Sequence, residues 1–472
     1  MVKRLMFLII SLAVLLGMGL ATTAAIAGDG LYGQLRWRWE GWNNLDDADS
    51  DNDDGFGYNF MRTRLGYSTE IGERGMFNFS IENTRVMGFD GVLSEEGYWW
   101  GPYKAAPWYW DTERVVIHEA NMGIADFLFK GFDAYAGRFS LSYGRERIIG
   151  PEDWAFYTEH RFDGFKGHYA FEKGWMDLFC LKLWESFVEK YDGSYDNGDE
   201  DLRGIYAHFD AAEGMYIEPY VLWYSTDNWG DEDEGYTYDN DSYYVFGALF
   251  DYMSDAGLHF YAEGVMVSGT ENEPYYEEDD EAVEYDISGL GFYAGLFYEF
   301  NSELKPFVGA ELNYASGTKM EDYENNEYKT FCSPYGSFSS YMGVMNMIDW
   351  SNTMTLRFSG GLTPVEGTDV KLDFYMFKLA SDEDTAYGAR NLLNFSDDVY
   401  DMDSLWGEDA DDDGVFDSKS VGTEIDFFVN HKIEDGVTLE GGVSMFSFGD
   451  YFGADNDYDS ILFGWLGAQV DF

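Results

Sequence analysis

Two pairs of arginines, each pair separated by one residue, are the side chains of this sequence best suited to bind a ligand. Arg36 and Arg38 stand in the stretch GQLRWRWEGW, and Arg62 and Arg64 stand in FMRTRLGY. Each guanidinium presents parallel N–H donors that match a carboxylate. Because side chains two positions apart share one face of a strand, each pair forms a cationic patch if its segment is a strand.

The residues between these arginines give the first segment two unlike faces. Polar and apolar side chains alternate there: Gln34, Arg36, Arg38 and Glu40 share one parity, and Leu35, Trp37 and Trp39 share the other. The apolar face of such a strand needs either a protein core or lipid. The two tryptophans suit a lipid interface, where aromatic side chains gather in belts. The polar face is then expected to line a wet lumen.

The same alternation assigns further titratable side chains to the wet face. The candidate pore-lining residues are Arg36, Arg38, Arg62, Arg64, Arg138, Lys166, His168 and Arg357, with the acids Glu40, Glu119, Glu424 and Asp426. Tyr135 and Phe139, which flank Arg138, are expected on the lipid side. Neighbouring strands lie about 4.8 Å apart, so the two arginine pairs can join in one patch.

Two interpretations of these cations stay open. In one, they form a path that passes a uronate chain from site to site. In the other, they pair with luminal acids and hold the wall, as in general diffusion pores. No lysine or arginine occurs between Gly204 and Leu304, where the wet face offers instead Glu218, Tyr220, His259, Tyr261 and Glu263. Any cationic path along the strands is therefore expected on one side of the lumen.

An acidic stretch near the C-terminus has the spacing of a calcium loop. DADDDGVFD places Asp409, Asp411, Asp413 and Asp417 around a glycine. Carboxylate oxygens are the ligands that Ca²⁺ prefers, and the glycine permits a tight turn. Ser420 stands where an EF-hand would need glutamate. The stretch therefore predicts a solitary Ca²⁺ loop, with a solvated, self-repelling loop as the alternative; no cofactor is required.

Short alternating segments repeat along the chain and predict its architecture. Eighteen can be counted, at 31–42, 58–71, 76–87, 115–124, 132–142, 162–171, 174–184, 203–210, 215–225, 243–251, 257–267, 286–300, 305–315, 353–362, 370–379, 421–432, 437–447 and 460–472. Tight turns such as GERG and AAEG alternate with long acidic connections such as 88–114 and 316–351. This pattern predicts an all-β protein, a transmembrane antiparallel β-barrel of about 18 strands with short periplasmic turns and long acidic extracellular loops. A secreted sandwich or solenoid is the main alternative.

The N-terminus predicts export. Lys3 and Arg4 precede an apolar run at 5–20, and AIA then offers small residues at the spacing that a signal peptidase reads. We expect a signal peptide at 1–27, which is removed, and a single barrel domain at 28–472.

The remaining composition narrows the class of protein. A formal net charge of −60 disfavours a nucleic-acid partner. Cys180 and Cys332 are too few for a disulfide scaffold and lack metal-site spacing. Cys180 is expected to be a buried free thiol, with pairing to Cys332 as the alternative.

His118 begins HEANM, which lacks the second histidine of a zinc protease, and no G-x-S-x-G stretch occurs. We therefore expect no enzymatic activity.

The C-terminal stretch GWLGAQVDF alternates and ends in an aromatic residue, Phe472. Such an end resembles the signal that the barrel-assembly machinery reads. We expect a protein of the bacterial outer membrane, with outer-membrane lipid and lipopolysaccharide as neighbours. A monomer is favoured.

Several stretches resemble the alginate-export family of outer-membrane porins. They are LRWRWEGWNN, FMRTRLGYSTEIGERGMFNFSIENTRVMG, AYAGRFSLSYGRERIIGPEDW, RFDGFKGHYAFEKGWMDLF and GTEIDFFVNHKIEDGVTLEGGVSMF. The resemblance is strongest over the first 160 or so mature residues and the last 50 or so. It implies a monomeric 18-stranded barrel whose luminal arginines carry a polyanionic polysaccharide outward.

The expected function is the passive passage of hydrophilic solutes, with an acidic polysaccharide as the implied cargo. One alternative is a general or cation-leaning diffusion porin. Another is a barrel whose Ca²⁺-ordered loops act as a surface interaction site. The connection at 316–351 is the first candidate for a constriction or lid. Its deletion should raise the conductance, and an unchanged conductance would exclude that role.

Overall fold

A computed structural model describes the chain over eleven ranges. These are residues 30–44, 55–87, 115–151, 153, 160–189, 195–227, 241–273, 283–337, 341–388, 418–452 and 458–472. The segment predicted as a signal peptide and the acidic stretch at 409–417 lie outside these ranges. Among the described residues, no helix has both the length and the apolar character needed to span a membrane.

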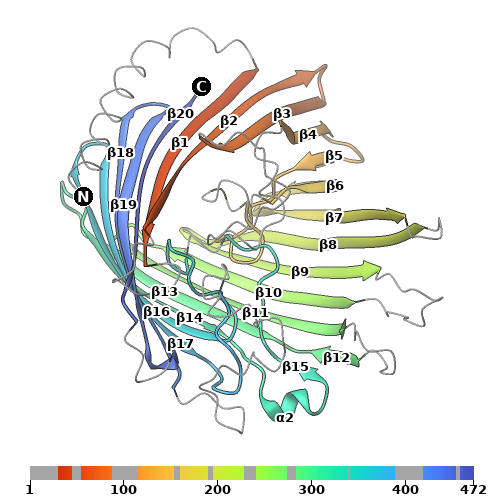
Figure 1. Ribbon diagram of the computed structural model, residues 1–472. Helices are drawn as coiled ribbons and strands as arrows, with labels where there is room; N and C mark the ends of the chain where they lie inside the picture. Colours follow the sequence, from red (N-terminus) through yellow and green to blue (C-terminus); the bar gives the residue numbers. More distant parts are fainter. Residues whose placement is uncertain are drawn as a thin grey trace.

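Eighteen strands of the described residues close into one antiparallel barrel (Figure 1). In pairing order they are β1 (Leu31–Asn43), β2 (Phe56–Ile71), β3 (Gly75–Val86), β4 (Val116–Ile124), β5 (Phe132–Phe139), β6 (Phe162–Phe171), β7 (Gly174–Glu189), β8 (Tyr195–Ala212), β9 (Met215–Asp227), β10 (Ser242–Met253), β11 (Leu258–Glu273), β13 (Leu290–Glu299), β14 (Phe307–Ala315), β16 (Thr353–Val365), β17 (Thr368–Leu379), β18 (Ser420–Glu434), β19 (Val437–Phe448) and β20 (Ile461–Asp471). Each of the eighteen predicted segments overlaps one of these strands, and the segment at 286–300 also includes the end of the short strand at Val283–Ile287. This agreement confirms the predicted fold.

The barrel closes by pairing its first strand with its last. In this register Arg36 lies opposite Arg62 on β2 and opposite Gln469 on β20. Closure leaves no exposed sheet edge in the wall, as a β-protein in lipid requires. The short turns are tight; at Gly214, for example, φ is +68° and an added Cβ would lie 2.2 Å from the carbonyl oxygen of Met253.

Short elements extend the wall at the side of the long connections. β12 (Val283–Ile287) pairs with the end of β11 and, in parallel, with β15 (Glu327–Tyr328). The helix α2 (Met320–Tyr323) precedes β15, and the 3₁₀ turn η3 (Asp450–Phe452) follows β19. The strands β7, β8 and β11 also continue farther on this side than the alternation predicted, because backbone pairing continues where polar side chains interrupt the pattern.

The two faces of the barrel differ in chemistry. Large apolar side chains are exposed on the outer face around the whole wall, among them Leu35, Leu65, Phe165, Ile205, Val221, Met266, Leu296, Val308, Phe358, Leu372, Phe427, Val443 and Leu462. Arg36, Arg38 and Glu40 are buried on the inner face. An apolar outside around a polar inside is the pattern of an outer-membrane barrel, and it confirms the predicted location.

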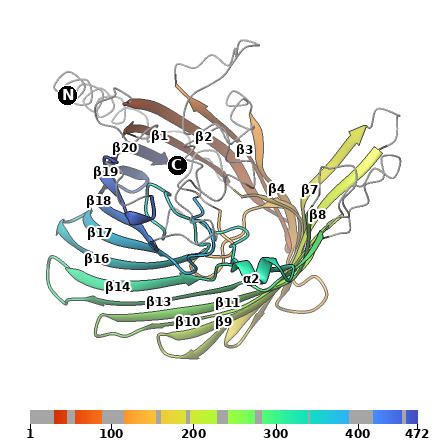
Figure 2. The ribbon, with the colours of Figure 1, turned by 60° about the horizontal axis from the view of Figure 1, so that its bottom comes forward.

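Two connections fold into the barrel and meet there (Figure 1, Figure 2). The crossing loop, described at residues 140–151 and 153, follows β5, and the inner loop, described at residues 330–337 and 341–352, follows β15. Ile149 bridges to Tyr335 in a parallel β-bridge. The backbone N–H of Gly150 donates to the carbonyl of Tyr335 at 2.8 Å. Within the predicted constriction at 316–351, most of the described residues from 330 onward are buried, whereas those at 316–329 are mostly partly or fully exposed.

The structure corrects the predicted face of Arg138. This arginine pairs with Asp163, which shares its parity with the strongly exposed Phe165, so both charges lie on the outer face. Tyr135 and Phe139, expected outside, instead lie inside, where the Nζ atom of Lys166 is 5.3 and 5.7 Å from their ring centroids. The prediction was wrong because it took aromatic side chains as a sign of lipid contact. On the inner face of this strand, the crossing loop offers such side chains an apolar partner as well.

The expected burial of Cys180 is also wrong. Both cysteines lie among the described residues, and neither forms a disulfide. Cys180 is exposed on the outer face of β7, since its parity is that of the exposed Leu178. The apolar sequence around it reflects contact with lipid rather than with a protein core.

Candidate functional site

The crossing loop begins with a tight reversal against the wall. The N–H of Glu146 donates to the carbonyl of Tyr143 at 2.9 Å, and both Gly144 and Glu146 have positive φ angles. A Cβ at Gly144 would lie 2.8 Å from the hydroxyl of Tyr206 on β8, so only glycine permits this approach. The reversal projects Arg145 and Arg147 toward the wall.

Arg147 anchors the crossing loop in the barrel. Its guanidinium donates to Glu311 at 2.7 Å and to Asn313 at 2.5 Å, both on β14. Its Cζ atom lies 3.8 Å from the ring centroid of Tyr341 and 4.1 Å from that of Tyr293. Only 2% of the side chain is exposed. A buried arginine with this set of partners fixes the position of the loop, because removing its ion-pair partner Glu311 would leave a buried charge uncompensated.

Arg145 is held more loosely than Arg147. Its Cζ atom lies 3.6 Å above the ring of Tyr261, and its nearest carboxylate, Asp251, is 3.6 Å away. The side chain is 32% exposed. A cation stacked on an aromatic face and weakly paired can accept a second anion without leaving its place.

The two loop arginines share a cavity with an arginine of the wall. The cavity has a volume of about 290 Å³ and is lined by Gly144, Arg145, Glu146, Arg147, Tyr216, Glu311, Tyr341 and Arg357. Arg357 on β16 pairs with Asp373 at 3.0 Å, and Lys371 pairs with the same carboxylate at 2.7 Å. The cavity lining therefore brings three guanidinium groups together, and each of them also has a carboxylate within ion-pair distance.

The four arginines singled out by the sequence lie together on the inner face of β1 and β2, and we call this region the arginine wall. Arg36 pairs with Glu440 at 3.1 Å, and Arg38 pairs with Glu40 at 2.5 Å. Arg64 bonds to Glu82 on β3. Each charge therefore has a carboxylate close by, as the structural interpretation of these cations expects.

The crossing loop reaches the arginine wall at its far end. Asp153 accepts from Arg62 at 3.0 Å and from Arg64 at 3.2 Å, and its backbone carbonyl accepts from Arg36 at 2.7 Å. The same loop thus contacts β14 through cations and β1 and β2 through an anion.

The wall between β7 and β14 is built from tyrosines that donate to carboxylates, and we call it the tyrosine–carboxylate wall. Tyr206 donates to Glu218 at 2.6 Å, and Tyr220 and Tyr293 each donate to Glu263 at 2.5 Å. These hydroxyls satisfy buried carboxylates where the strands supply no lysine or arginine.

The other predicted pore-lining residues make separate contacts. Lys166 and His168 face Asp177 at 3.9 and 2.6 Å. Glu119 accepts from the side chain of Asn78 at 2.5 Å and from the N–H of Ser140 at 3.3 Å. These residues lie on the inner face but do not join the arginine wall.

Glu424 and Asp426 hold the inner loop. Glu424 accepts the N–H of Met345 at 3.0 Å, and Asp426 accepts that of Val344 at 3.3 Å. Nearby in this loop, burial alone raises the pKa of Asp349 to about 7. The two predicted pore-lining acids therefore position a loop, and a carboxyl group of that loop titrates near neutrality.

Arg145 and Arg147 are the functional candidates that the strand alternation missed. Side-chain parity places residues of strands only, and these two belong to a loop. A signal was present, since both stand in GRERIIG, inside one of the stretches that resemble the alginate-export family.

The predicted Ca²⁺ ligands Asp409, Asp411, Asp413 and Asp417 lie outside the described residues. Within the described ranges, no group of three or more His, Cys, Asp or Glu side chains is arranged to hold a metal ion.

Comparisons with known proteins agree with the barrel fold. The family model described as alginate export matches residues 33–461. A comparison with curated protein sequences gives no match. Among solved structures, the barrel is similar to OccK8 (OprE) of Pseudomonas aeruginosa, with 9% identity, a TM-score of 0.54, and 94% and 99% of the two chains covered. For Acinetobacter baumannii OccAB4 the values are 9%, 0.54, 94% and 98%. At this identity the likeness concerns the fold.

Proposed function

The chain belongs to the alginate export family, and from that premise we propose that this outer-membrane β-barrel channel passes an acidic saccharide chain through the cavity beside the crossing loop. The family is one of channels, so the chain is a transport protein and not an enzyme. The observation that carries the proposal is the shared cavity of Arg145, Arg147 and Arg357.

The three arginines divide the work of binding an anion. Arg147 and Arg357 are nearly buried and pair closely with wall carboxylates, so they fix the shape of the cavity and leave Arg145 as the cation that can exchange partners. Arg145 is partly exposed and its pair with Asp251 is long. A uronate carboxylate arriving at Arg145 replaces one weak carboxylate contact with another, so binding is reversible and a chain can advance.

The experiment is a reversal-potential measurement on the purified barrel in a planar bilayer under a salt gradient, with and without added oligouronate. We expect anion preference and a block by oligouronate. Arg145→Gln should weaken the block about tenfold, the value of one charge-assisted contact. The matched control is Lys378→Gln, which removes the same charge from an exposed position on the outer parity of β17 and should leave the block unchanged.

Cation preference without block would overturn the proposal. The acids of the tyrosine–carboxylate wall and of the loops would then control the pore, and the barrel would be a cation-leaning diffusion porin. A block that Arg145→Gln leaves intact would instead move the binding site away from this cavity.

A further inference from the structure

The outer face of β5–β10 carries a polar row above its apolar belt. Cross-strand register places six side chains side by side in this row: Arg138, Asp163, Lys182, Asp201, Ser225 and Ser242. Cys180 on the outer face of β7 precedes Lys182 by two positions, so the row shares its side of the sheet. The row thus presents cations to the surroundings of the barrel rather than to its lumen.

The height of this row places it at a membrane surface. Lys182 follows the short turn that ends at Gly174 by eight residues. At about 3.3 Å per residue and a strand tilt of about 40°, the row lies roughly 20 Å above the short turns. The apolar band of such barrels is about 25 Å tall. The row therefore lies roughly 5 Å below the upper edge of a band that begins at the short turns. Its long cationic side chains can extend from there to the headgroups of the outer leaflet.

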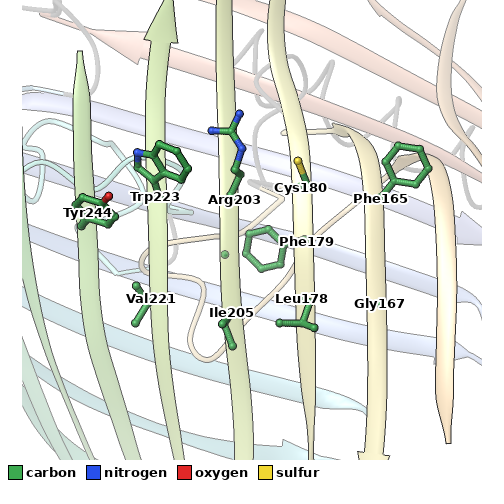
Figure 3. Close-up of a pocket in the computed structure, with 11 residues that line it drawn as sticks. Phe165, Gly167, Leu178, Phe179, Cys180, Arg203, Ile205, Val221, Trp223 and Tyr244 are labelled. Atoms are coloured by element: carbon green, nitrogen blue, oxygen red, sulfur yellow. The ribbon is translucent and has the colours of Figure 1, made fainter. Parts of the chain in front are cut away.

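A groove borders the polar row on the side of the short turns, and Figure 3 shows the residues that line it. Its upper edge is one cross-strand row: Phe165, Cys180, Arg203, Trp223 and Tyr244. The next row down consists of Gly167, Leu178, Ile205 and Val221. The groove has a volume of about 450 Å³, and Arg203 is the charged residue in its lining. Its walls are otherwise apolar or aromatic, which suits a hydrocarbon chain.

Arg203 connects the groove to the polar row. Its guanidinium lies 4.6 Å above the ring of Trp223 and donates to Asp201 at 2.8 Å and to Ser225 at 3.1 Å. Lys182 approaches the same Asp201 at 3.1 Å. Both cations are about one-third exposed. Lys182 also pairs with Asp199 at 2.8 Å, so two cations and two carboxylates lie together at the mouth of an apolar groove.

We propose that this groove binds a phosphorylated, multiply acylated glycolipid of the outer leaflet, with a phosphate on Arg203 and Lys182 and an acyl chain along Leu178, Ile205 and Val221. A phosphate offers more charge and more acceptor oxygens than Asp201, so it can hold both cations at once. Arg138 lies three strands from Arg203 in the same region, about 15 Å away at 4.8 Å per strand. It pairs with Asp163 but is 40% exposed, so a second phosphate can reach it. The site depends on the outer face alone and not on what the pore conducts.

The test measures lipid retained by the full-length barrel in detergent, by native mass spectrometry after incubation with lipid A. We expect Arg203→Gln to lower retention about tenfold, since one charge-assisted hydrogen bond to phosphate is lost. Arg203→Gln with Lys182→Gln should lower it further. Lys378→Gln removes an equal charge from the outer parity of β17, and it should retain lipid A as the unchanged barrel does.

A ligand-side experiment keeps the test decisive if a variant folds poorly. The unchanged barrel is incubated with lipid A from which both phosphates have been removed, and retention should fall at least as far as in Arg203→Gln. Equal retention of the two lipids would overturn the proposal. So would equal retention by the Arg203→Gln and Lys378→Gln variants, or phosphatidylglycerol held as strongly as lipid A, which would show a site for any anionic lipid.

Discussion

The arginine wall and the tyrosine–carboxylate wall solve the same physical problem in opposite ways. Both line the inside of one barrel, and both bury carboxylates. The arginine wall neutralises them with guanidinium groups, as Arg38 does for Glu40. The tyrosine–carboxylate wall leaves the charge in place and satisfies it with hydroxyl donors, as Tyr220 and Tyr293 do for Glu263. The arginine wall has one cation more than its strand carboxylates Glu40, Glu82 and Glu440, and the other wall is negative.

The crossing loop complements each wall with the charge that the wall lacks. It presents Arg145 and Arg147 to the negative wall and Asp153 to the arginine wall. The difference between the walls therefore specifies where the loop docks and in which direction it runs. It also shows why the strands between Gly204 and Leu304 need no basic residue: the loop supplies the cations.

The largest expected effect on stability comes from removing Arg147, the crossing-loop cation that pairs with the tyrosine–carboxylate wall. Arg147→Leu leaves Glu311 buried without its ion-pair partner, which should lower the free energy of unfolding by about 3–5 kcal/mol. The measurement is urea unfolding of the barrel in lipid vesicles. Arg147→Leu combined with Glu311→Leu should recover a large part of the loss, because no unpaired charge is left.

Arg145→Leu is the matched control for Arg147→Leu. It removes a neighbouring arginine of the same loop that is partly exposed, and its cost should stay within about 1 kcal/mol. Equal losses for the two variants would contradict the assignment of Arg147 as the anchor and Arg145 as the exchangeable cation.

The second prediction concerns how the docking of the inner loop in the barrel depends on pH. The raised pKa of Asp349 means that the docked loop prefers the protonated carboxyl, whereas an undocked loop has an ordinary pKa of about 3.9. Docking is therefore strongest in acid and weakens as the pH rises. Between about pH 4 and the pKa of about 7, the ratio of docked to undocked loop should fall up to about tenfold per pH unit, and it should level off above pH 7.

Single-channel recording between pH 4.5 and pH 8 tests this effect. We expect conductance fluctuations to become more frequent as the pH rises, and Asp349→Asn to make their frequency independent of pH. A pH response that Asp349→Asn leaves intact would assign the response to another group.

The strands were predictable from the sequence, and the docking of the loops was not. A period of two in residues such as those from Gln34 to Glu40 follows from the pleat, so eighteen segments could be found one at a time. The alternation predicted the wrong face for Arg138, because the aromatic side chains next to it can contact either lipid or a loop that fills the lumen. The positions of Arg145 and Arg147 depend on contacts with β11 and β14, more than 100 residues away, which no local pattern contains.

A smaller effect is expected within the tyrosine–carboxylate wall. Tyr220→Phe removes one of the two hydroxyls that donate to Glu263 and leaves the other, from Tyr293. The loss of one hydrogen bond to a buried charge should cost about 1.5–3 kcal/mol in the same unfolding experiment. Tyr244→Phe, on the exposed outer face, should change the stability by less than about 0.5 kcal/mol. A cost for Tyr220→Phe as small as that of Tyr244→Phe would mean that this wall is held by packing rather than by its hydroxyls.

The smallest effect on stability is expected at the other end of the crossing loop. Asp153 is half exposed, and its backbone carbonyl keeps the bond from Arg36 whatever its side chain is. Asp153→Asn should therefore cost under about 1 kcal/mol, yet it removes a negative charge beside Arg62 and Arg64 and should shift the reversal potential toward anions. Asp163→Asn removes the same charge from the outer face and should leave the reversal potential unchanged. If Asp153→Asn lowered the free energy of unfolding as much as Arg147→Leu does, the two walls would hold the loop equally. The arginine wall would then be a second anchor of the loop and not a surface open to a passing anion.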